Sequence, residues 1–317
     1  TPDIDVTSND AFFDEDPIAT AVYYAAEKFY DYLLYVHGRN SIDDNGHTLK
    51  AWVHYQTHDE IGWNNAGWLS SFAVFGDGDN IKYAPLASID IVAHEFTHGL
   101  TQRTAHLRYV GESGALHEGF SDIFGTLVEF YAEPFCADWL IGEDIVVQNG
   151  KTASRSMSNP KDATMLTQAP NTYKGEYWHF SWQDHGGVHT NSSILNYWFY
   201  LIVNGGSGTN DNDFPYSVAA LDNNAYVARS KAADIAFLSL TEYLNKFAQY
   251  ADARAATIDA AIAIYGENSS EVQTVISAWC AVGVGECEIN TNTITLITPN
   301  GGEVWPVSYT HLRAHET

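Results

Sequence analysis

Apolar residues recur at the spacing of a helix in the first part of the chain. Between residues 11 and 36, side chains such as Val22, Phe29 and Leu33 fall on one face when the segment is drawn as a helix. The polar residues between them fall on the other faces. The pattern therefore predicts a helix with one buried face.

Two shorter segments favour strands. Residues 48–54 and 72–75 alternate apolar and polar positions or carry a continuous β-prone run. The Gly-Asp-Gly-Asp run at 76–79 then predicts a turn. From residue 89 the period changes to i, i+3, i+4 and i+7. We expect a helix there with a single apolar stripe, formed by Ile89, Val92, Ala93, Phe96 and Leu100.

The remainder of the chain is dominated by helical spacing. Helices are predicted over residues 116–132, 190–204, 224–247, 252–265 and 269–280. A polar loop is expected at 205–208, where the sequence is Gly-Gly-Ser-Gly. Strands are thus confined to a mixed first part and helices fill the rest, which predicts an α+β fold with two lobes.

The charge balance excludes some classes of partner. The 317 residues include 40 Asp and Glu against 15 Lys and Arg, a formal net charge of −25 at pH 7. Nucleic acid and anionic membrane are therefore not expected as partners, because like charges repel. No apolar run approaches the roughly 18 residues that span a membrane, and no signal-peptide pattern begins at Thr1. The acidity fits a secreted protein.

Three cysteines are too few for a disulfide framework, and none forms a CxxC pair. Cys280 and Cys287 could close a small loop in an oxidising compartment. The alternative is that the thiols stay reduced and pack as small apolar groups, and for Cys136 this interpretation is equally good.

The strongest chemical signal is the segment His94-Glu95-Phe96-Thr97-His98. On a helix, residues four apart share a face, so both imidazoles can reach one metal ion. Glu95 lies one residue further round, where its carboxylate can reach a water beside the metal rather than the metal itself. The alternative is a helix whose two histidines are partly buried and bonded to carbonyl groups.

A catalytic zinc needs three protein ligands and one open position. Glu118 comes 20 positions after His98, which is enough chain for a turn and the start of a second helix. Asp122 follows at i+4 on the same face as Glu118, where it can hold a ligating imidazole by its other nitrogen. The alternative is an ordinary pair of acids in the first turn of a helix, favoured by the helix dipole.

Several ordered segments resemble the thermolysin family of zinc metallopeptidases. The resemblance covers roughly residues 8–285, and it is carried by residues 64–68, 91–98, 111–131, 155–158 and 186–191. It implies a two-lobed zincin fold, with a β-containing N-terminal lobe, a mainly helical C-terminal lobe and the active site between them. The activity implied is that of a secreted zinc metalloendopeptidase.

The resemblance also suggests boundaries. Residues 1–98 are the remainder of the N-terminal lobe with the active-site helix, and residues 99–285 are the helical lobe. Residues 286–306 resemble the opening of an Ig-like extension, and 307–317 resemble a non-native tail. Family members carry a further β-rich segment ahead of this region and a propeptide that assists folding, and they act on peptide or protein substrates as monomers.

The resemblance assigns roles at the centre of the site. The zinc ligands it implies are His94, His98 and Glu118. Glu95 is the implied general base, and Tyr109 and His189 are the implied donors to the tetrahedral oxyanion. Asp184 matches the carboxylate that orients the catalytic histidine.

Substrate contacts are also implied by the resemblance. Asn65 and the backbone of Ala66 match residues that contact the substrate strand. Arg155 matches an arginine beside the pocket for the side chain that follows the cleaved bond. Ser154 stands where the family has a leucine in that pocket, which should otherwise remain apolar and favour apolar residues after the cut. The residues expected to keep it apolar are Leu86, Ile91 and Ile141.

A second metal is expected from four acids that match the calcium ligands of the family: Asp90, Glu129, Asp138 and Glu143. Carboxylate oxygens suit that ion. Leu140 replaces a further glutamate of the thermolysin pattern, so we expect one calcium rather than a pair. The alternative is that some of these acids form a solvated acidic face.

The motifs of several other enzyme classes do not occur in this sequence. The sequence has no GxSxG, GxxxxGK[ST] or GxGxxG motif. Aminopeptidases of the related gluzincin group share HExxH and a later glutamate, but their exopeptidase motif is absent. From a different class, the chain could be a binding protein that keeps the fold without catalysis, although Glu95 and all three ligand positions are retained.

Overall fold

The computed structural model describes residues 16–57 and 62–285. Its first element is helix α1, Pro17–His37. The Asp16 side chain caps it by accepting hydrogen bonds from the backbone N–H groups of Ile18 and Ala19, and proline occupies the first position. Gly38 ends the helix in the left-handed conformation. The helix expected between residues 11 and 36 is therefore confirmed from Pro17 onward, and residues 11–15 lie outside the described part.

A small sheet lies next to α1 and α2. Its strands are β1 Ala51–Trp52, β2 Ala66–Trp68 and β3 Ala73–Phe75, in the order β1-β3-β2. Strand β1 is parallel to β3, and β2 is antiparallel to it. The strands predicted at 48–54 and 72–75 are confirmed, though they are short. Strand β2 was not predicted, because its three residues are too few for any alternation to be visible.

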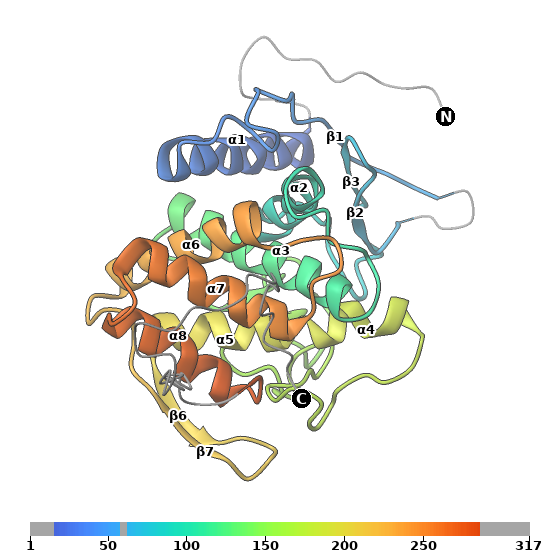
Figure 1. The fold of residues 1–317 in the computed structure, drawn as a ribbon. Helices are drawn as coiled ribbons and strands as arrows, with labels where there is room; N and C mark the ends of the chain where they lie inside the picture. The colour runs from blue at the N-terminus through green and yellow to red at the C-terminus, as the bar shows by residue number, and fades with distance from the viewer. Residues whose placement is uncertain (1–15, 58–61, 286–317) are drawn as a thin grey trace, which may run out of the picture. The chain divides into compact units, whose positions relative to one another are not determined.

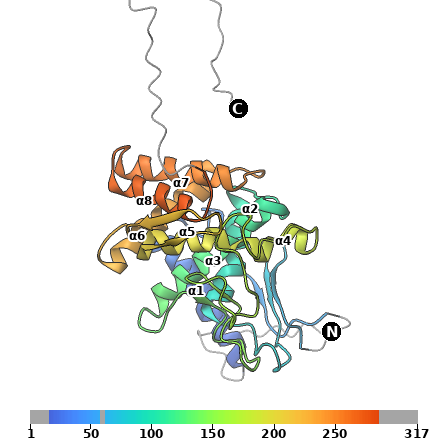
Figure 2. The ribbon, with the colours of Figure 1, turned by 90° about the horizontal axis from the view of Figure 1, so that it is seen from below.

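Two helices form the centre of this unit: α2, Ile89–Arg103, and α3, Gly111–Ala132. Helix α3 lies between α1 and α5 in both views (Figures 1 and 2). A Cβ at Gly125 would lie only 2.6 Å from the carbonyl oxygen of Asp90, so glycine is what allows the backbones of α2 and α3 to approach so closely.

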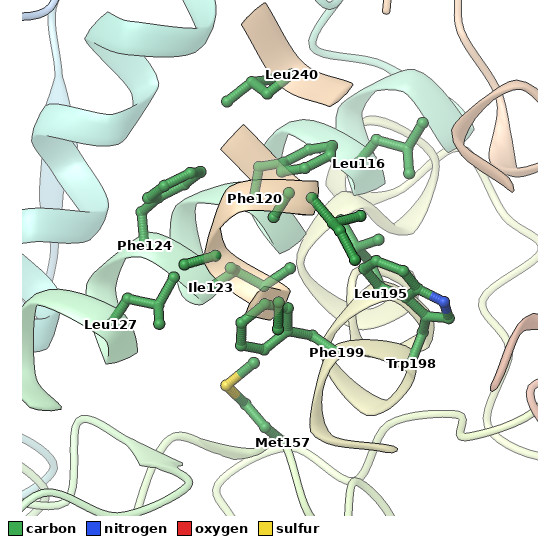
Figure 3. Packing of buried hydrophobic residues seen from close by; sticks show 14 of the residues in the cluster. Leu116, Phe120, Ile123, Phe124, Leu127, Met157, Leu195, Trp198, Phe199 and Leu240 are labelled. Atoms are coloured by element: carbon green, nitrogen blue, oxygen red, sulfur yellow. The ribbon is translucent and has the colours of Figure 1, made fainter. Parts of the chain in front are cut away.

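The apolar core surrounds α3. Figure 3 shows side chains of α3 and α5 packed together, among them Phe120, Ile123, Leu195 and Phe199. Residues 113–129 of α3 are buried without interruption. A helix that is buried on all sides shows no contrast between an apolar and a polar face. For this reason the periodicity of apolar residues predicted this helix only from residue 116, whereas it begins at Gly111.

The other helices are α4 Asp184–Asn191, α5 Ser193–Asn204, α6 Ala225–Leu238, α7 Tyr250–Tyr265 and α8 Ser270–Ala281. The helix predicted over 224–247 is too long. Helix α6 passes into a π-helical turn, Ser239–Tyr243, and the chain becomes extended at Leu244.

Two two-stranded sheets complete the architecture. Strands β4 Leu140–Ile141 and β5 Arg155–Ser156 pair antiparallel beside α3. Strands β6 Gly206–Thr209 and β7 Pro215–Val218 form an antiparallel pair. The polar loop expected at 205–208 is thus wrong. All four residues of β6 are exposed, so no apolar alternation marked it.

The chain divides into two units, residues 1–287 and 288–317. The expected extension at 286–306 and the tail at 307–317 lie outside the described residues, as does Cys287.

Cys280 is disulfide-bonded. Cys136 is a free thiol, but it is exposed rather than packed in the core. Within the described ranges, no helix has the length and apolar character needed to cross a membrane.

The last residue of α1 joins it to the helical core. The His37 ring stacks on Phe237 of α6 at 4.1 Å between centroids and meets Phe124 of α3 edge-on. Its side chain is 2% exposed, and Nε2 has no hydrogen-bond partner in the described residues. Burial lowers the pKa of His37 to about 4, even though an Asp234 carboxylate oxygen lies 3.8 Å from Nδ1.

This burial predicts an acid-dependent loss of stability. The unfolded chain takes up a proton at His37 near pH 6.5, whereas the folded protein does so only near pH 4. The free energy of unfolding should therefore fall as pH falls from 6.5 to 4, by up to about 3 kcal/mol from this residue. Urea unfolding at several pH values tests this against His37→Phe, which should lack that part of the slope. Equal slopes would contradict it.

Candidate metal centre

Three potential ligands meet where α2 faces α3. His94 and His98 come from α2, and Glu118 comes from the middle of α3. All three are buried, and one ligand atom from each lies within 4.8 Å of the others. Among the described residues, this is the only such group of His, Cys, Asp and Glu side chains.

The spacing of the ligand atoms fits zinc. Atoms held about 2.0–2.1 Å from one tetrahedral zinc lie about 3.3 Å from each other. Nε2 of His94 is 3.3 Å from Glu118 Oε2, and Nε2 of His98 is 3.5 Å from Glu118 Oε1. The hydrogen bonds described below also occupy Nδ1 of both rings, which leaves Nε2 free. The residues present therefore fit a zinc ion.

His94 is held by a carboxylate one helical turn beyond Glu118. Nδ1 of His94 lies 2.8 Å from Asp122 Oδ1. The Asp122 carboxylate also accepts two hydrogen bonds from Arg155, at 2.7 and 3.0 Å, and one from Asn196, at 2.7 Å. Burial alone would raise the pKa of Asp122, but the Arg155 charge and His94 lower it to about 2. Asp122 thus stays ionised and fixes the His94 ring.

His98 has a partner that sequence reasoning missed. Its Nδ1 lies 2.8 Å from Nδ1 of His117 and 3.2 Å from Oγ of Ser121. Burial lowers the pKa of His117 to about 4, so this ring is neutral and one of its nitrogens accepts a hydrogen bond. With the Nδ1 proton of His98 donated to that acceptor, Nε2 of His98 is directed to the ligand group. In the sequence, the only sign of this role is that His117 stands next to Glu118.

Among the ligand residues, His94 and Glu118 favour their charged forms. Burial alone would lower the pKa of His94, but the neighbouring carboxylates of Asp122 and Glu118 raise it to about 10. Burial alone would raise the pKa of Glu118, but His189, His98 and His94 hold it well below its usual range. Zinc would replace a proton here and meet an ionised carboxylate.

Glu95 lies beside the ligands, and one of its carboxylate oxygens has no hydrogen bond within the described residues. The residue is 7% exposed, and the oxygen without a partner is Oε2. That atom is 3.9 Å from Nε2 of His98. Burial raises the pKa of Glu95 to about 7. A carboxylate in this state can accept or release a proton near neutral pH.

Two further polar groups face the ligands from the open side. Tyr109 precedes α3, and its hydroxyl donates to Glu118 Oε1 and lies 3.1 Å from Nε2 of His189 on α4. Burial raises the pKa of Tyr109, so the phenol keeps its proton. Burial would lower the pKa of His189, but Glu118 and Asp184 raise it. Nδ1 of His189 lies 2.5 Å from Asp184 Oδ1.

The start of α4 has an unusual backbone. Asp184, His185, Gly186 and Gly187 have φ of 52°, 50°, 93° and 78°. A Cβ at Gly187 would lie 2.6 Å from the His179 side chain, so only glycine fits there. This turn directs His189 to the metal centre.

A cleft of about 550 Å³ opens onto the ligands. Among the predicted substrate residues, those that line it are Asn65, Ala66, Leu86, Ile91 and Arg155. Ile141 is 1% exposed and is not part of the lining, whereas Ile145, four residues on, is. Ser154 and Tyr83 also line the cleft.

The predicted calcium acids influence one another. Asp90 is buried and accepts backbone hydrogen bonds from Ile91 and Gly142, at 2.7 and 2.6 Å. Burial, together with Asp90 and Glu143, raises the pKa of Glu129 to about 10, and burial with Asp90 raises that of Glu143 to about 7. Asp138 is exposed. Glu129 Oε2 and Glu143 Oε2 are buried without a hydrogen-bond partner in the described part of the chain.

Comparison with known proteins agrees with this geometry. The sequence matches the family "Thermolysin metallopeptidase, catalytic domain" over residues 2–102 and "Thermolysin metallopeptidase, alpha-helical domain" over 105–284. It is 41% identical to bacillolysin from Bacillus cereus over 85% of this chain and 44% of that protein. It is also 41% identical to thermolysin from Alicyclobacillus acidocaldarius, over 87% of this chain and 47% of that protein.

A solved structure shows the same architecture. The precursor of protealysin, a metalloproteinase from Serratia proteamaculans, superposes with a TM-score of 0.71 at 31% identity, over 86% of this chain and 80% of that one. Fold and metal centre together define the class of two-lobed zincins, as expected from the sequence. Within that class, the chain belongs to the thermolysin metallopeptidase family. It spans less than half the length of the bacillolysin and thermolysin above.

The His98–His117 contact predicts a measurable effect on zinc binding. The purified protein should hold about one zinc per chain, and His94→Ala should hold none. His117→Ala should weaken zinc binding about 10- to 100-fold, because His98 loses the group that fixes its ring. Competition with a zinc chelator measures this. His54→Asn, which removes a histidine that is remote from the ligands and also has a positive φ, is the control. Unchanged affinity in His117→Ala would contradict the assignment.

Proposed function

We propose that this protein is a secreted zinc metalloendopeptidase that hydrolyses peptide bonds in proteins. The observation that carries the proposal is the buried Oε2 atom of Glu95, which lies beside the ligand atoms of His94, His98 and Glu118 and has no hydrogen-bond partner in the described residues. Leaving a buried carboxylate oxygen without a hydrogen bond is unfavourable for the fold. A proton-transfer role beside the metal explains it.

Glu95 is the proposed general base. Zinc, when bound by His94, His98 and Glu118, supplies a Lewis acid that activates water and polarises the peptide carbonyl. Glu95 accepts the proton of the attacking water and passes it to the leaving amide nitrogen. A pKa of about 7 suits both transfers near neutral pH. No covalent bond to the protein is required.

Tyr109 and His189 are the proposed donors to the oxygen on which negative charge develops. Burial raises the pKa of Tyr109, and Glu118 and Asp184 raise the pKa of His189, which favours the protonated form of each group. Donors fixed in advance act without reorganisation, and one such donor typically accounts for about 3–4 kcal/mol of the barrier. Asp184 fixes the His189 ring through its Nδ1 and its backbone N–H.

The substrate is proposed to bind along strand β2 as an extended chain. Asn65 and Ala66 line the cleft where β2 begins, and Ala66 pairs with Phe75 within the sheet. The side chain after the cut would enter the region beside Arg155, where Leu86 and Ile91 offer apolar walls. These apolar walls support a preference for apolar residues directly after the cleaved bond.

Calcium is the proposed partner of Asp90, Glu129, Asp138 and Glu143. The unpartnered oxygens of Glu129 and Glu143 and the mutual repulsion of these acids support a bound cation. Bound calcium would neutralise charge at the start of α2 and the end of α3, and so stabilise the helix pair that carries the zinc ligands.

We further propose that the boundary between the lobes lies near residue 98, that the protein is a secreted monomer, and that a propeptide assists its folding. The likeness to the precursor of protealysin supports the propeptide. The alternative, a binding protein without catalysis, shares the fold and the zinc site, so only activity separates the two.

Glu95→Gln separates catalysis from binding. The change keeps the size of the side chain but removes its ability to accept a proton. We expect zinc content to stay at about one per chain and the rate of peptide cleavage to fall about 10²- to 10⁴-fold. Glu27→Gln on the outside of α1 is the control. Cleavage at the normal rate by Glu95→Gln would contradict the assigned role. A zinc-loaded wild-type protein that cleaves nothing would favour the binding protein.

Calcium should raise the thermal stability of the zinc-saturated protein. Free calcium at about 100 times its Kd should add about 2.7 kcal/mol to the free energy of unfolding. Glu143→Gln should reduce this response, because a carboxylate ligand is lost. Thermal melts across a calcium titration measure it, with the exposed Glu267→Gln as the control. The same response in all three proteins would show that calcium binds elsewhere or not at all.

A further inference from the structure

The loop between α2 and α3 contains a histidine in a backbone conformation that favours glycine. His106 has a φ of 55°, and its N–H donates to the carbonyl oxygen of Thr101 at 2.8 Å. Glycine usually makes such a bond at the end of a helix, because a side chain is strained at positive φ. His106 is exposed, lines the cleft and makes no side-chain hydrogen bond within the described residues. Because the fold gains no contact from the imidazole, the strain points to a function in the cleft.

Two unpaired cations adjoin the same loop. The Arg108 N–H donates to the carbonyl oxygen of Lys246 at 2.9 Å. Both side chains lie over the Phe247 ring, with Arg108 Cζ 5.9 Å and Lys246 Nζ 4.8 Å from its centroid. Both residues are exposed, and neither has an ion pair in the part of the chain that the structure describes. Leu107 and Tyr109, on either side of Arg108 in the sequence, line the cleft, so this charge borders the path of a bound chain.

We call these three residues the basic rim of the cleft: His106, Arg108 and Lys246. Acids close to them in the sequence do not neutralise the rim. Glu112 accepts hydrogen bonds from the Tyr173 hydroxyl at 2.6 Å and from the Tyr250 N–H at 3.1 Å. Glu242, four residues before Lys246, makes no ion pair within residues 16–57 and 62–285. The chain carries a formal net charge of −25, so the rim reverses the sign of the charge locally.

A carboxylate is the group that complements the basic rim. Exposed cations attract it, and the imidazole N–H of His106 can donate to its oxygens whichever ring nitrogen carries the proton. A nucleic acid or other long polyanion would extend beyond the rim and be repelled by the acidic remainder of the protein. A single acidic side chain placed at the rim avoids that repulsion.

We propose that the basic rim binds an aspartate or glutamate of the substrate that lies a few residues from the cleaved bond. His106 donates to the carboxylate, and Arg108 and Lys246 attract it by charge. The inference rests on the proposed peptidase function and narrows its substrates to segments with an acidic residue at one position. That position is separate from the apolar one directly after the cut.

A glutamate scan of peptide substrates tests the proposal. Quenched fluorescent peptides keep one apolar residue directly after the cut and carry either Gln or Glu at one of the other positions near it. At low salt we expect the kcat/KM of the Glu peptide to exceed that of the Gln peptide about 3- to 10-fold at one position or two adjacent ones, as for two exposed ion pairs. High salt should reduce this ratio, because it screens exposed charges.

Variants assign the effect to the basic rim. Arg108→Gln with Lys246→Gln should abolish the advantage of Glu, and Arg108→Gln alone should reduce it. Lys50→Gln is the matched control, because it removes one exposed cation ahead of β1, at the opposite edge of the sheet from β2, and should leave the ratio unchanged. His106→Gly should reduce the ratio without loss of thermal stability, because glycine holds the positive φ without strain.

Three outcomes overturn the proposal. These are a ratio near one at every position, an equal gain at every position, and a gain that persists in the Arg108→Gln, Lys246→Gln double variant. If the zinc-loaded protein cleaves none of the peptides, the proposed function fails and the rim is tested by binding. Fluorescence anisotropy of the same peptides, each with a single label, gives Kd values for the zinc-loaded protein. Tighter binding of the Glu peptide, lost in the double variant, would support the rim, and equal Kd values would overturn it.

Discussion

The close contact between the backbones of α2 and α3 is the constraint on which the rest of this structure depends. Two ligand histidines come from one helix and the ligand glutamate from the other, so the separation of the helices fixes the separation of the ligand atoms. Gly125 makes the contact possible at Asp90. Asp90 is also one of the proposed calcium acids, so the same crossing point joins both metal sites. A change that moved the helices apart would disturb both.

Burial makes the partners of the ligands as important as the ligands. Arg155 and Asn196 hold Asp122, Asp122 holds His94, and His117 holds His98. Each charge in this chain of contacts is paired, because an unpaired charge in such a place is strongly unfavourable. Two carboxylate oxygens beside the ligands lack a hydrogen-bond partner within the described residues: Oε2 of Glu118, a proposed zinc ligand, and Oε2 of Glu95. For Glu95, this is consistent with the proposal that its partner is a reacting group rather than the protein.

Sequence reasoning succeeded where one local period carried the information. His94 and His98 lie one turn apart on α2, so five consecutive residues reveal that they share a face. Glu118 and Asp122 lie one turn apart on α3, so their relation is equally local. The contact of His117 with His98 was not predictable in this way, since it depends on how α2 crosses α3. The meeting of Tyr83 with Ser154 joins residues 71 positions apart. Exposed strand β6 left no apolar pattern, and the apolar spacing did not distinguish the π-helical turn after α6 from a longer α-helix.

The turn that begins α4 has a consequence for how mutations there must be interpreted. Asp184 and His185 hold positive φ, which costs a residue other than glycine about 1–2 kcal/mol. The two hydrogen bonds from His189 to the Asp184 side chain offset that strain. Without the carboxylate, no hydrogen bond offsets the strain of the positive φ angles, so the backbone can relax. Such a relaxation would move His189 away from the ligands. An inactive Asp184 variant would then resemble the loss of a catalytic acid, although the cause would be a change in backbone conformation.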